Sequence, residues 1–273
     1  MEDIHEVATT ATSSLVHATT EAAHSSGIHV ALAPEIIGNL WGIPITNTLI
    51  TSWVVLALLI GLAFFFSRRP QLVPGRIQII LETIVTTVHD FMRETLENDK
   101  VARRYLPLLC TLFLFIATSN LLEFLPGVGS IGFFHAEEFT PLFRSVNTDL
   151  NVTLALAIIV VILIEIAGIM ALGFFKYAGK FINFSSPVNF VVGLIELVSE
   201  ISRLVSFSFR LFGNIFAGEV LLAVVAFFVP YVLPVPLMGF EMFVGVIQGA
   251  VFALLTLFFI KLAIMEPHAE EAH

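Results

Sequence analysis

One arginine lies in the middle of the longest apolar segment of the chain. Arg210 falls within residues 187–229, which are rich in Leu, Val, Ile and Phe and contain no proline after the first residue. No acid stands three or four residues from Arg210, so a helix would give it no ion-pair partner of its own. An arginine near the centre of a bilayer costs about 2.5 to 3.5 kcal/mol, so we expect it to have a function. Its guanidinium keeps its proton near neutral pH and repels cations, which suits a barrier in a proton path.

Other polar residues of this segment gather on one side of the expected helix. At ~100° per residue, seven polar residues fall within an arc of about 120°. They are Glu196, Ser199, Glu200, Arg203, Ser206, Arg210 and Asn214. Glu219 falls outside the arc. An internal ion pair with Glu196 or Glu200 is the simpler interpretation for Arg203. The polar arc also includes Arg210, which has no such ion-pair partner. This side of the helix therefore needs a partner helix, an ion path or water to face.

The composition is that of a protein with several membrane spans. Of the 273 residues, 57% are hydrophobic and 13% are charged, and the mean hydropathy is +0.94. No ordinary soluble domain has this balance. The formal net charge of −9 gives no sign of nucleic-acid binding. The single cysteine, Cys110, lies in an apolar run and has no internal disulfide partner.

Five apolar segments are long enough to cross a bilayer as helices. They are residues 45–66, 105–125, 149–172, 187–229 and 238–264. The fourth would be roughly 64 Å long at ~1.5 Å per residue, about twice the ~30 Å hydrocarbon core, so it is expected to be steeply tilted or broken. We therefore predict an all-α polytopic membrane protein. Its last two helices form a long tilted hairpin around an uncharged turn at 230–237.

The segments between the spans are predicted to lie at the membrane surface. Residues 76–98 carry apolar side chains at helical spacing on one face, which predicts an interfacial amphipathic helix. Residues 31–43 are expected at the interface as well, with Trp41 as an anchor. Residues 126–148 and the basic segment 176–186 are expected to be loops.

The chain is divided into a polar tail at 1–37, an integral membrane domain at 38–266 and an acidic tail at 267–273. The four histidines of the first tail lack the spacing of metal ligands. A GxGxxG pattern at 127–132 follows a membrane helix instead of a strand, which argues against a dinucleotide site. We therefore expect no metal, cofactor, nucleotide or nucleic-acid partner. His89 and His135 are interpreted as solvated surface residues, and Glu123 as an interfacial acid at a helix end.

The basic residues predict the orientation of the chain in the membrane. Of the thirteen Lys and Arg residues, seven lie between residues 68 and 104, two lie in the segment 176–186, and Lys261 closes the last span. On the opposite side of the membrane, Arg144 is the only basic residue in a loop, and residues 1–67 contain no basic residue. The positive-inside rule then places the N-terminus outside and the C-terminus in the cytoplasm.

This orientation places polar groups on both sides of Arg210. Glu196 and Glu200 lie toward the cytoplasm, and Glu219 lies toward the outside. The polar residues expected in the outer half of the neighbouring spans are Asp149, Asn151, Glu241 and Gln248. Carboxylates and water carry protons through membranes, and the fixed charge of Arg210 prevents a continuous leak.

Two further features concern the neighbouring spans. Gly245 and Gly249 form a small-xxx-small pattern, which is expected to pack closely against the long helix. Glu165 lies inside the third span and has two interpretations, a group of the channel or a hydrogen-bonded structural acid.

The stretch SFSFRLFGNIFAGE, residues 206–219, resembles the signature helix of the a subunit of F-type ATP synthase. The similarity rests on an Arg followed by Leu-Phe-Gly-Asn and then by Ala-Gly-Glu in the penultimate membrane helix. DLNVTLALA, residues 149–157, resembles the start of the third span in that family, and SNLLEFLPG resembles the end of the second. The resemblance covers residues 38–266, without the two tails.

The resemblance implies a proton-translocating stator subunit with two offset aqueous half-channels. The implied partners are a rotor ring of c subunits with buried carboxylates, the b subunits of the peripheral stalk and the lipid bilayer. Arg210 matches the essential arginine that faces the ring carboxylates, and Asn214 matches a supporting residue. The residues assigned to the outer half-channel are Glu219, Glu241, Gln248, Asp149 and Asn151. Those assigned to the inner half-channel are Glu196, Ser199 and Ser206. Glu123, Glu165 and Glu200 are not carried over.

Other functional classes fit the sequence less well. A self-contained secondary transporter or ion channel is the alternative, but neither inverted repeats nor broken half-helices are evident. A voltage sensor needs several regularly spaced arginines, and a membrane enzyme needs a nucleophile or metal motif that the sequence lacks. The start lacks a basic presequence, which favours a bacterial inner membrane and leaves an organelle-encoded chain as the alternative. The sequence leaves the choice between H⁺ and Na⁺ open.

Overall fold

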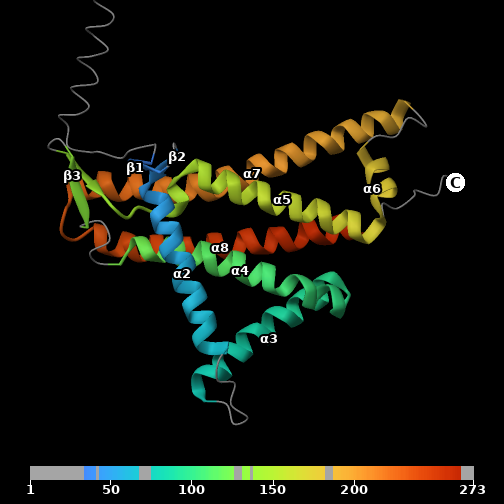
Figure 1. The fold of residues 1–273 in the computed structure, drawn as a ribbon, viewed down its shortest axis with the longest axis horizontal. Coiled ribbons are helices and arrows are strands. Elements are labelled where there is room, and N and C mark those ends of the chain that lie inside the picture. Colours follow the sequence, from blue (N-terminus) through green and yellow to red (C-terminus); the bar gives the residue numbers. More distant parts are fainter. Residues whose placement is uncertain are drawn as a thin grey trace, which may run out of the picture.

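The computed structural model describes residues 34–40, 43–67, 75–125, 131–135, 138–181 and 187–265 (Figure 1). The helices are α2 (Asn47–Ser67), α3 (Arg76–Leu96), α4 (Asp99–Glu123), α5 (Leu150–Leu172), α6 (Phe174–Phe181), α7 (Pro187–Phe228) and α8 (Pro234–Ile264). The strands are β1 (Ile36–Leu40), β2 (Ile43–Thr46), β3 (Gly132–His135) and β4 (Glu138–Pro141), and η2 (Val146–Thr148) is a short 3-10 helix. Most of both tails, Trp41, Gly127 and Gly129 lie outside the described residues, so the predictions made for them are not addressed.

Five helices of the described ranges are long and apolar enough to cross a membrane, namely α2, α4, α5, α7 and α8. This confirms the predicted all-α polytopic fold, and α7 ends within one residue of its predicted boundary. Figure 1 shows α4, α5, α7 and α8 running side by side, while α2 crosses their common direction. With 42 residues, α7 is about 63 Å long at 1.5 Å per residue and exceeds the ~30 Å hydrocarbon core, so it has to be strongly inclined.

The last helix begins earlier than the sequence suggests. The predicted turn at 230–237 is shorter in the structure, because α8 starts at Pro234. Pro234 and Pro236 both lie in the first helical turn, where backbone N–H groups have no partner within the helix and proline is tolerated. The predicted start of the last helix, residue 238, is therefore four residues too late, because the prediction places these prolines in the turn.

The packing partner of the small-xxx-small pattern was predicted wrongly. Gly245 and Gly249 face α4 instead of α7. A β-carbon at Gly245 would lie 2.8 Å from Cβ of Asn120, and one at Gly249 would lie 3.2 Å from the backbone nitrogen of Ala117. The two glycines thus let α8 and α4 approach closely, and α8 makes its most extensive contacts with α4.

The two ends of the helix bundle differ in character. At one end, called here the hairpin end, lie the start of α5, the α7–α8 turn and the two antiparallel β-hairpins. Strands β3 and β4 correct the loop predicted at 126–148, and β1 lies within the segment 31–43 that was expected at the interface, because pairing strands satisfies backbone groups that loops would leave open. The opposite end, called the α6 end, holds α6 between the ends of α5 and α7 (Figure 1). There a short helix replaces part of the loop predicted at 176–186.

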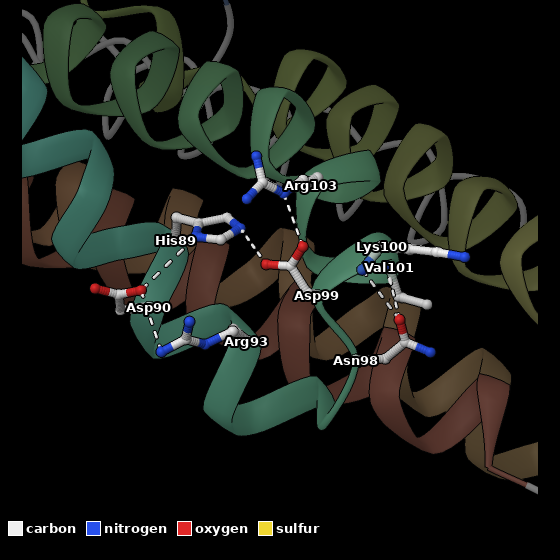
Figure 2. Close-up of polar contacts among 8 residues, drawn as sticks. All are labelled: His89, Asp90, Arg93, Asn98, Asp99, Lys100, Val101 and Arg103. Carbon is white, nitrogen blue, oxygen red and sulfur yellow. Dashed lines mark hydrogen bonds and ion pairs between the residues drawn. The ribbon is translucent and has the colours of Figure 1, made fainter.

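The predicted amphipathic helix at 76–98 is α3, and it joins α4 through a polar cluster (Figure 2). Nε2 of His89 lies 3.4 Å from Asp99, and the His89 side chain is only 13% exposed. His89 is therefore not the solvated surface residue that the sequence suggested. Asp99 also accepts a 2.8 Å hydrogen bond from Arg103. The cluster fixes the tight connection between α3 and α4, where Glu97 has a left-handed φ of 55°.

Candidate functional site

Arg210 lies on an exposed face of α7 together with other predicted polar residues. Ser199, Ser206, Arg210 and Asn214 are all exposed. Nη2 of Arg210 donates a hydrogen bond to Oγ of Ser206 over 3.1 Å, and Nδ2 of Asn214 donates to the carbonyl oxygen of Arg210 over 2.9 Å. Within the described part of the chain, no carboxylate forms an ion pair with Arg210. Its charge is therefore directed away from this chain.

The other members of the predicted arc face inward. Nη1 of Arg203 lies 2.6 Å from Oε2 of Glu200, which confirms that Arg203 has an internal partner. The guanidinium of Arg203 also stacks on the ring of Phe259 in α8, with its carbon 4.1 Å from the ring centroid. Glu196 forms an ion pair with Lys180 of α6. The polar arc is thus divided: the residues around Arg210 are exposed, and the acids and Arg203 pack within the chain.

Acidic residues meet an arginine at the hairpin end. Nη2 of Arg144 lies 3.4 Å from Oε2 of Glu219, and the two side chains are 9% and 27% exposed. The carboxyl group of Glu241 on α8 lies against Gly218 on α7. Glu123, at the end of α4, lies within electrostatic range of Arg144, Glu219 and Glu241. Acids from three helices therefore gather in one region, where Arg144 pairs with Glu219.

Sequence reasoning missed two members of this cluster. Arg144 served only as a charge in the topology argument, and Glu123 was interpreted as an interfacial acid. Arg144 is the one cation in its loop, which could have pointed to it. No sequence spacing relates Glu123 to Glu219, because the two residues meet only through the packing of α4 and α7 against α8.

The start of α5 is held by polar contacts. Asp149 is 3% exposed and caps α5, since its Oδ1 accepts a 2.9 Å hydrogen bond from the backbone N–H of Asn151. Its Oδ2 accepts a hydrogen bond from the hydroxyl of Thr48 in α2 over 2.9 Å. The Asn151 side chain is exposed. Asp149 therefore connects α2 to α5 at the hairpin end.

A second polar chain joins α4, η2 and α8 close by. Nδ2 of Asn147 donates to Oδ1 of Asn120 over 2.6 Å, and Nδ2 of Asn120 donates to the carbonyl oxygen of Gly245 over 2.9 Å. Gln248, one turn further along α8, is half-buried and makes no side-chain hydrogen bond with the other described residues. Buried polar contacts of this kind fix helices relative to one another where the surrounding surface is apolar.

The predicted site residues therefore occupy both sides of Arg210 along α7. Glu219 lies about 13 Å from Arg210 toward the hairpin end, and Glu196 about 21 Å toward the α6 end, at 1.5 Å per residue. Asp149, Glu241 and Asn151 belong to the hairpin-end group. No group of three His, Cys, Asp or Glu residues that could hold a metal ion is found among the described residues. The arrangement places polar and charged side chains on each side of an outward-facing cation along an apolar helix.

Comparison with known proteins gives consistent matches. The family model described as ATP synthase A chain matches residues 49–261. The ATP synthase subunit a of Moorella thermoacetica is 34% identical over 227 residues, covering 83% of this chain and 94% of the relative. A Campylobacter jejuni subunit a is 36% identical over 214 residues, covering 77% of this chain and 85% of the relative. A Propionigenium modestum protein named ATP synthase subunit a, sodium ion specific, is 34% identical over 230 residues. The match covers 84% of this chain and 78% of the relative.

Proposed function

The chain belongs to the ATP synthase A chain family, and from that premise we propose that it is the proton-translocating stator subunit of the ATP synthase membrane sector. In this role it provides two offset half-channels that load and unload protons on the carboxylates of a rotating c-subunit ring. The observation that supports this role most directly is the exposed face of Arg210, which carries a charge without a carboxylate partner among the described residues. A membrane-facing arginine is costly unless a partner of opposite charge meets it.

Arg210 is proposed to separate the two half-channels. A ring carboxylate that approaches the guanidinium is favoured in its charged form and gives up its proton. The guanidinium itself does not lose its proton, so no proton passes straight through. Ser206 and Asn214 lie one helical turn before and after Arg210. The hydroxyl of Ser206 accepts a hydrogen bond from the guanidinium of Arg210, and the side-chain amide of Asn214 donates one to the backbone carbonyl of Arg210.

The outer half-channel is proposed to run through the hairpin end. Its residues are Glu219, Glu241, Gln248, Asp149 and Asn151, with Glu123 and Arg144 added from the structure. Carboxyl groups from α4, α7 and α8 meet here, and such groups relay protons within membranes. Arg144 offsets part of their negative charge and keeps the cluster compact.

The inner half-channel is proposed to run along the α6 end. Its residues are Glu196, Ser199 and Ser206. Glu196 is held by Lys180 near the mouth, and the two serines lie on the exposed edge of α7 between Glu196 and Arg210. The positive-inside pattern supports a cytoplasmic location of this end, with the N-terminus outside.

We further propose the surroundings of this subunit. It lies in a bacterial inner membrane and contacts the c ring through α7 and the b subunits of the peripheral stalk. It binds no nucleotide or nucleic acid itself, so ATP is made by other subunits of the complex. The carried ion is proposed to be the proton, and ATP-driven pumping in sodium-free buffer would test this choice against the sodium-specific naming of one relative.

Disulfide cross-linking tests the proposed contact with the ring. In a chain whose Cys110 is replaced by alanine, cysteines are placed singly at Ser206, Arg210, Asn214 and Ala217, all on the exposed face of α7. Each is paired with a cysteine beside the ring carboxylate. The control position is Ser208, which is fully buried and lies 3.4 Å from Thr153 of α5.

The expected result is a cross-link at the exposed positions and none at Ser208. Cross-links of equal yield at Ser208 would contradict the proposed orientation of α7. An absence of cross-links on the exposed face, together with ion transport by the purified chain alone, would instead establish a self-contained transporter or channel.

A further inference from the structure

Two acids and a tyrosine meet at the α6 end, apart from the residues assigned above. Glu165 on α5 lies beside the hydroxyl of Tyr177 on α6 and the carboxyl group of Glu200 on α7. Tyr177 is 4% exposed and Glu200 is 9% exposed. One carboxyl oxygen of each acid, Oε1, is buried and has no hydrogen-bond partner among the residues that the structure describes. Three elements that are distant in the sequence therefore converge on one polar site.

Two glycines make this convergence possible. A β-carbon at Gly168 of α5 would overlap the ring of Tyr177, so the ring lies directly on the α5 backbone. A β-carbon at Gly193 of α7 would overlap the carbonyl oxygen of Phe181, which ends α6. Burial, followed by its interaction with Glu165, raises the pKa of Tyr177, so its hydroxyl keeps its proton and is available as a donor.

Two cations lie near the two acids. Arg203 lies 2.6 Å from Glu200 and stacks on Phe259 of α8. Lys180 of α6 is paired with Glu196. Lys180 also acts electrostatically on Glu200, so the described acids Glu165, Glu196 and Glu200 lie near two cations, Arg203 and Lys180.

We propose that Glu165 and Glu200 together form a proton-relay station of the inner half-channel, with Tyr177 as a positioning residue that orients Glu165. This inference rests on the proposed function. The station lies on the α6 side of Arg210, and Glu200 is about 15 Å from Arg210 along α7 at 1.5 Å per residue. A proton that binds one carboxyl group from one side passes to the other carboxyl group and leaves toward the other side. The pair thus returns to its starting state after each transfer, and no electrons move.

The test uses inverted membrane vesicles that contain the assembled complex, so that the medium sets the pH at the α6 side. ATP-driven proton pumping is measured over a range of medium pH and divided by the ATP hydrolysis rate of the same vesicles. The variants are Glu165→Gln, Glu200→Gln and Tyr177→Phe. The matched control is Glu82→Gln, because Glu82 is an exposed acid of α3 that contacts Gln78.

Loss of one relay carboxyl is expected to lower the normalised rate at least about tenfold and to change its pH profile. Tyr177→Phe is expected to change the pH profile with a smaller loss of rate, and Glu82→Gln to match the unmodified chain. An unchanged rate and pH profile in Glu165→Gln would overturn the inference. If Glu165→Gln does not accumulate in the membrane, Tyr177→Phe decides, and an unchanged pH profile there overturns the inference.

Failure of the proposed function gives a different result. If Arg210→Ala still pumps protons, the divided path itself is wrong. If Arg210→Ala abolishes pumping while the relay variants behave like the unmodified chain, the divided path stands and only the Glu165–Glu200 station is rejected.

Discussion

The carboxyl group of Glu241 lies directly against the backbone of Gly218, so that a β-carbon at Gly218 would overlap both carboxyl oxygens. Glu241 is 7% exposed. This contact joins α7 to α8 beside the Arg144–Glu219 ion pair. It gives the glycine of the Ala-Gly-Glu motif a physical role, because any side chain there would displace the acid from the hairpin-end cluster.

Substitution of this glycine is the first prediction. Gly218→Ala is expected to slow proton transport by displacing the Glu241 carboxyl group, with only a small loss of stability because the end of a flexible side chain can move aside. The control is Gly239→Ala in the same helix as Glu241, where a β-carbon meets nothing within 4 Å. Thermal unfolding of the purified chain and ATP-driven pumping measure the two effects. Equal behaviour of the two variants would show that the Gly218–Glu241 contact is unimportant.

The exposed arginine leads to the second prediction. Arg210→Ala is expected to abolish ATP-driven proton pumping, because nothing then separates the proposed half-channels or attracts a carboxylate of the proposed ring partner. The measurement is the quenching of a pH-sensitive dye in inverted vesicles. Ser208→Ala is the control, since Ser208 lies two residues away but is fully buried against α5. Normal pumping by Arg210→Ala would refute the proposed mechanism.

The sequence was sufficient to predict the spans and to restrict the partner of Arg203 to Glu196 or Glu200. Hydropathy alone located five helices, and α7 runs from Pro187 to Phe228 as expected. The Glu200–Arg203 pair was accessible because residues three apart in a helix are neighbours. Local spacing thus predicts contacts within one helix reliably.

Contacts between helices were harder to predict. The membrane helix α8 is apolar on most of its surface, so its sequence does not reveal which face meets which neighbour. For that reason Gly245 and Gly249 were assigned to α7, although they contact α4. The approach of Glu123 to Glu219, and of Glu165 to Glu200, depends in the same way on how separate helices pack.

The start of α4 gives the third prediction. The side chain of Asn98 accepts hydrogen bonds from the backbone N–H groups of Lys100 and Val101 over 3.0 and 3.3 Å (Figure 2). Asn98→Ala removes this cap and is expected to lower the free energy of unfolding by about 1 kcal/mol. Asn98→Asp keeps an acceptor oxygen and is expected to retain most of the stability. Unfolding of the purified chain in detergent micelles measures both, and an equal loss in the two variants would contradict a capping role.

The ion pair between Arg144 and Glu219 gives the fourth prediction. A double-mutant cycle with Arg144→Gln and Glu219→Gln is expected to give a coupling energy of about 0.5 to 3 kcal/mol, because both side chains are largely removed from solvent. The same cycle on Arg103 and Asp99 is the reference, since those side chains are 70% and 44% exposed and their coupling should be smaller. Thermal unfolding of the four chains of each cycle supplies the energies. A coupling at the hairpin end no larger than that of the exposed pair would mean that water screens Arg144 from Glu219. The proposed outer half-channel would then be open to solvent at this depth, and Arg144 would not be the residue that holds the acids together.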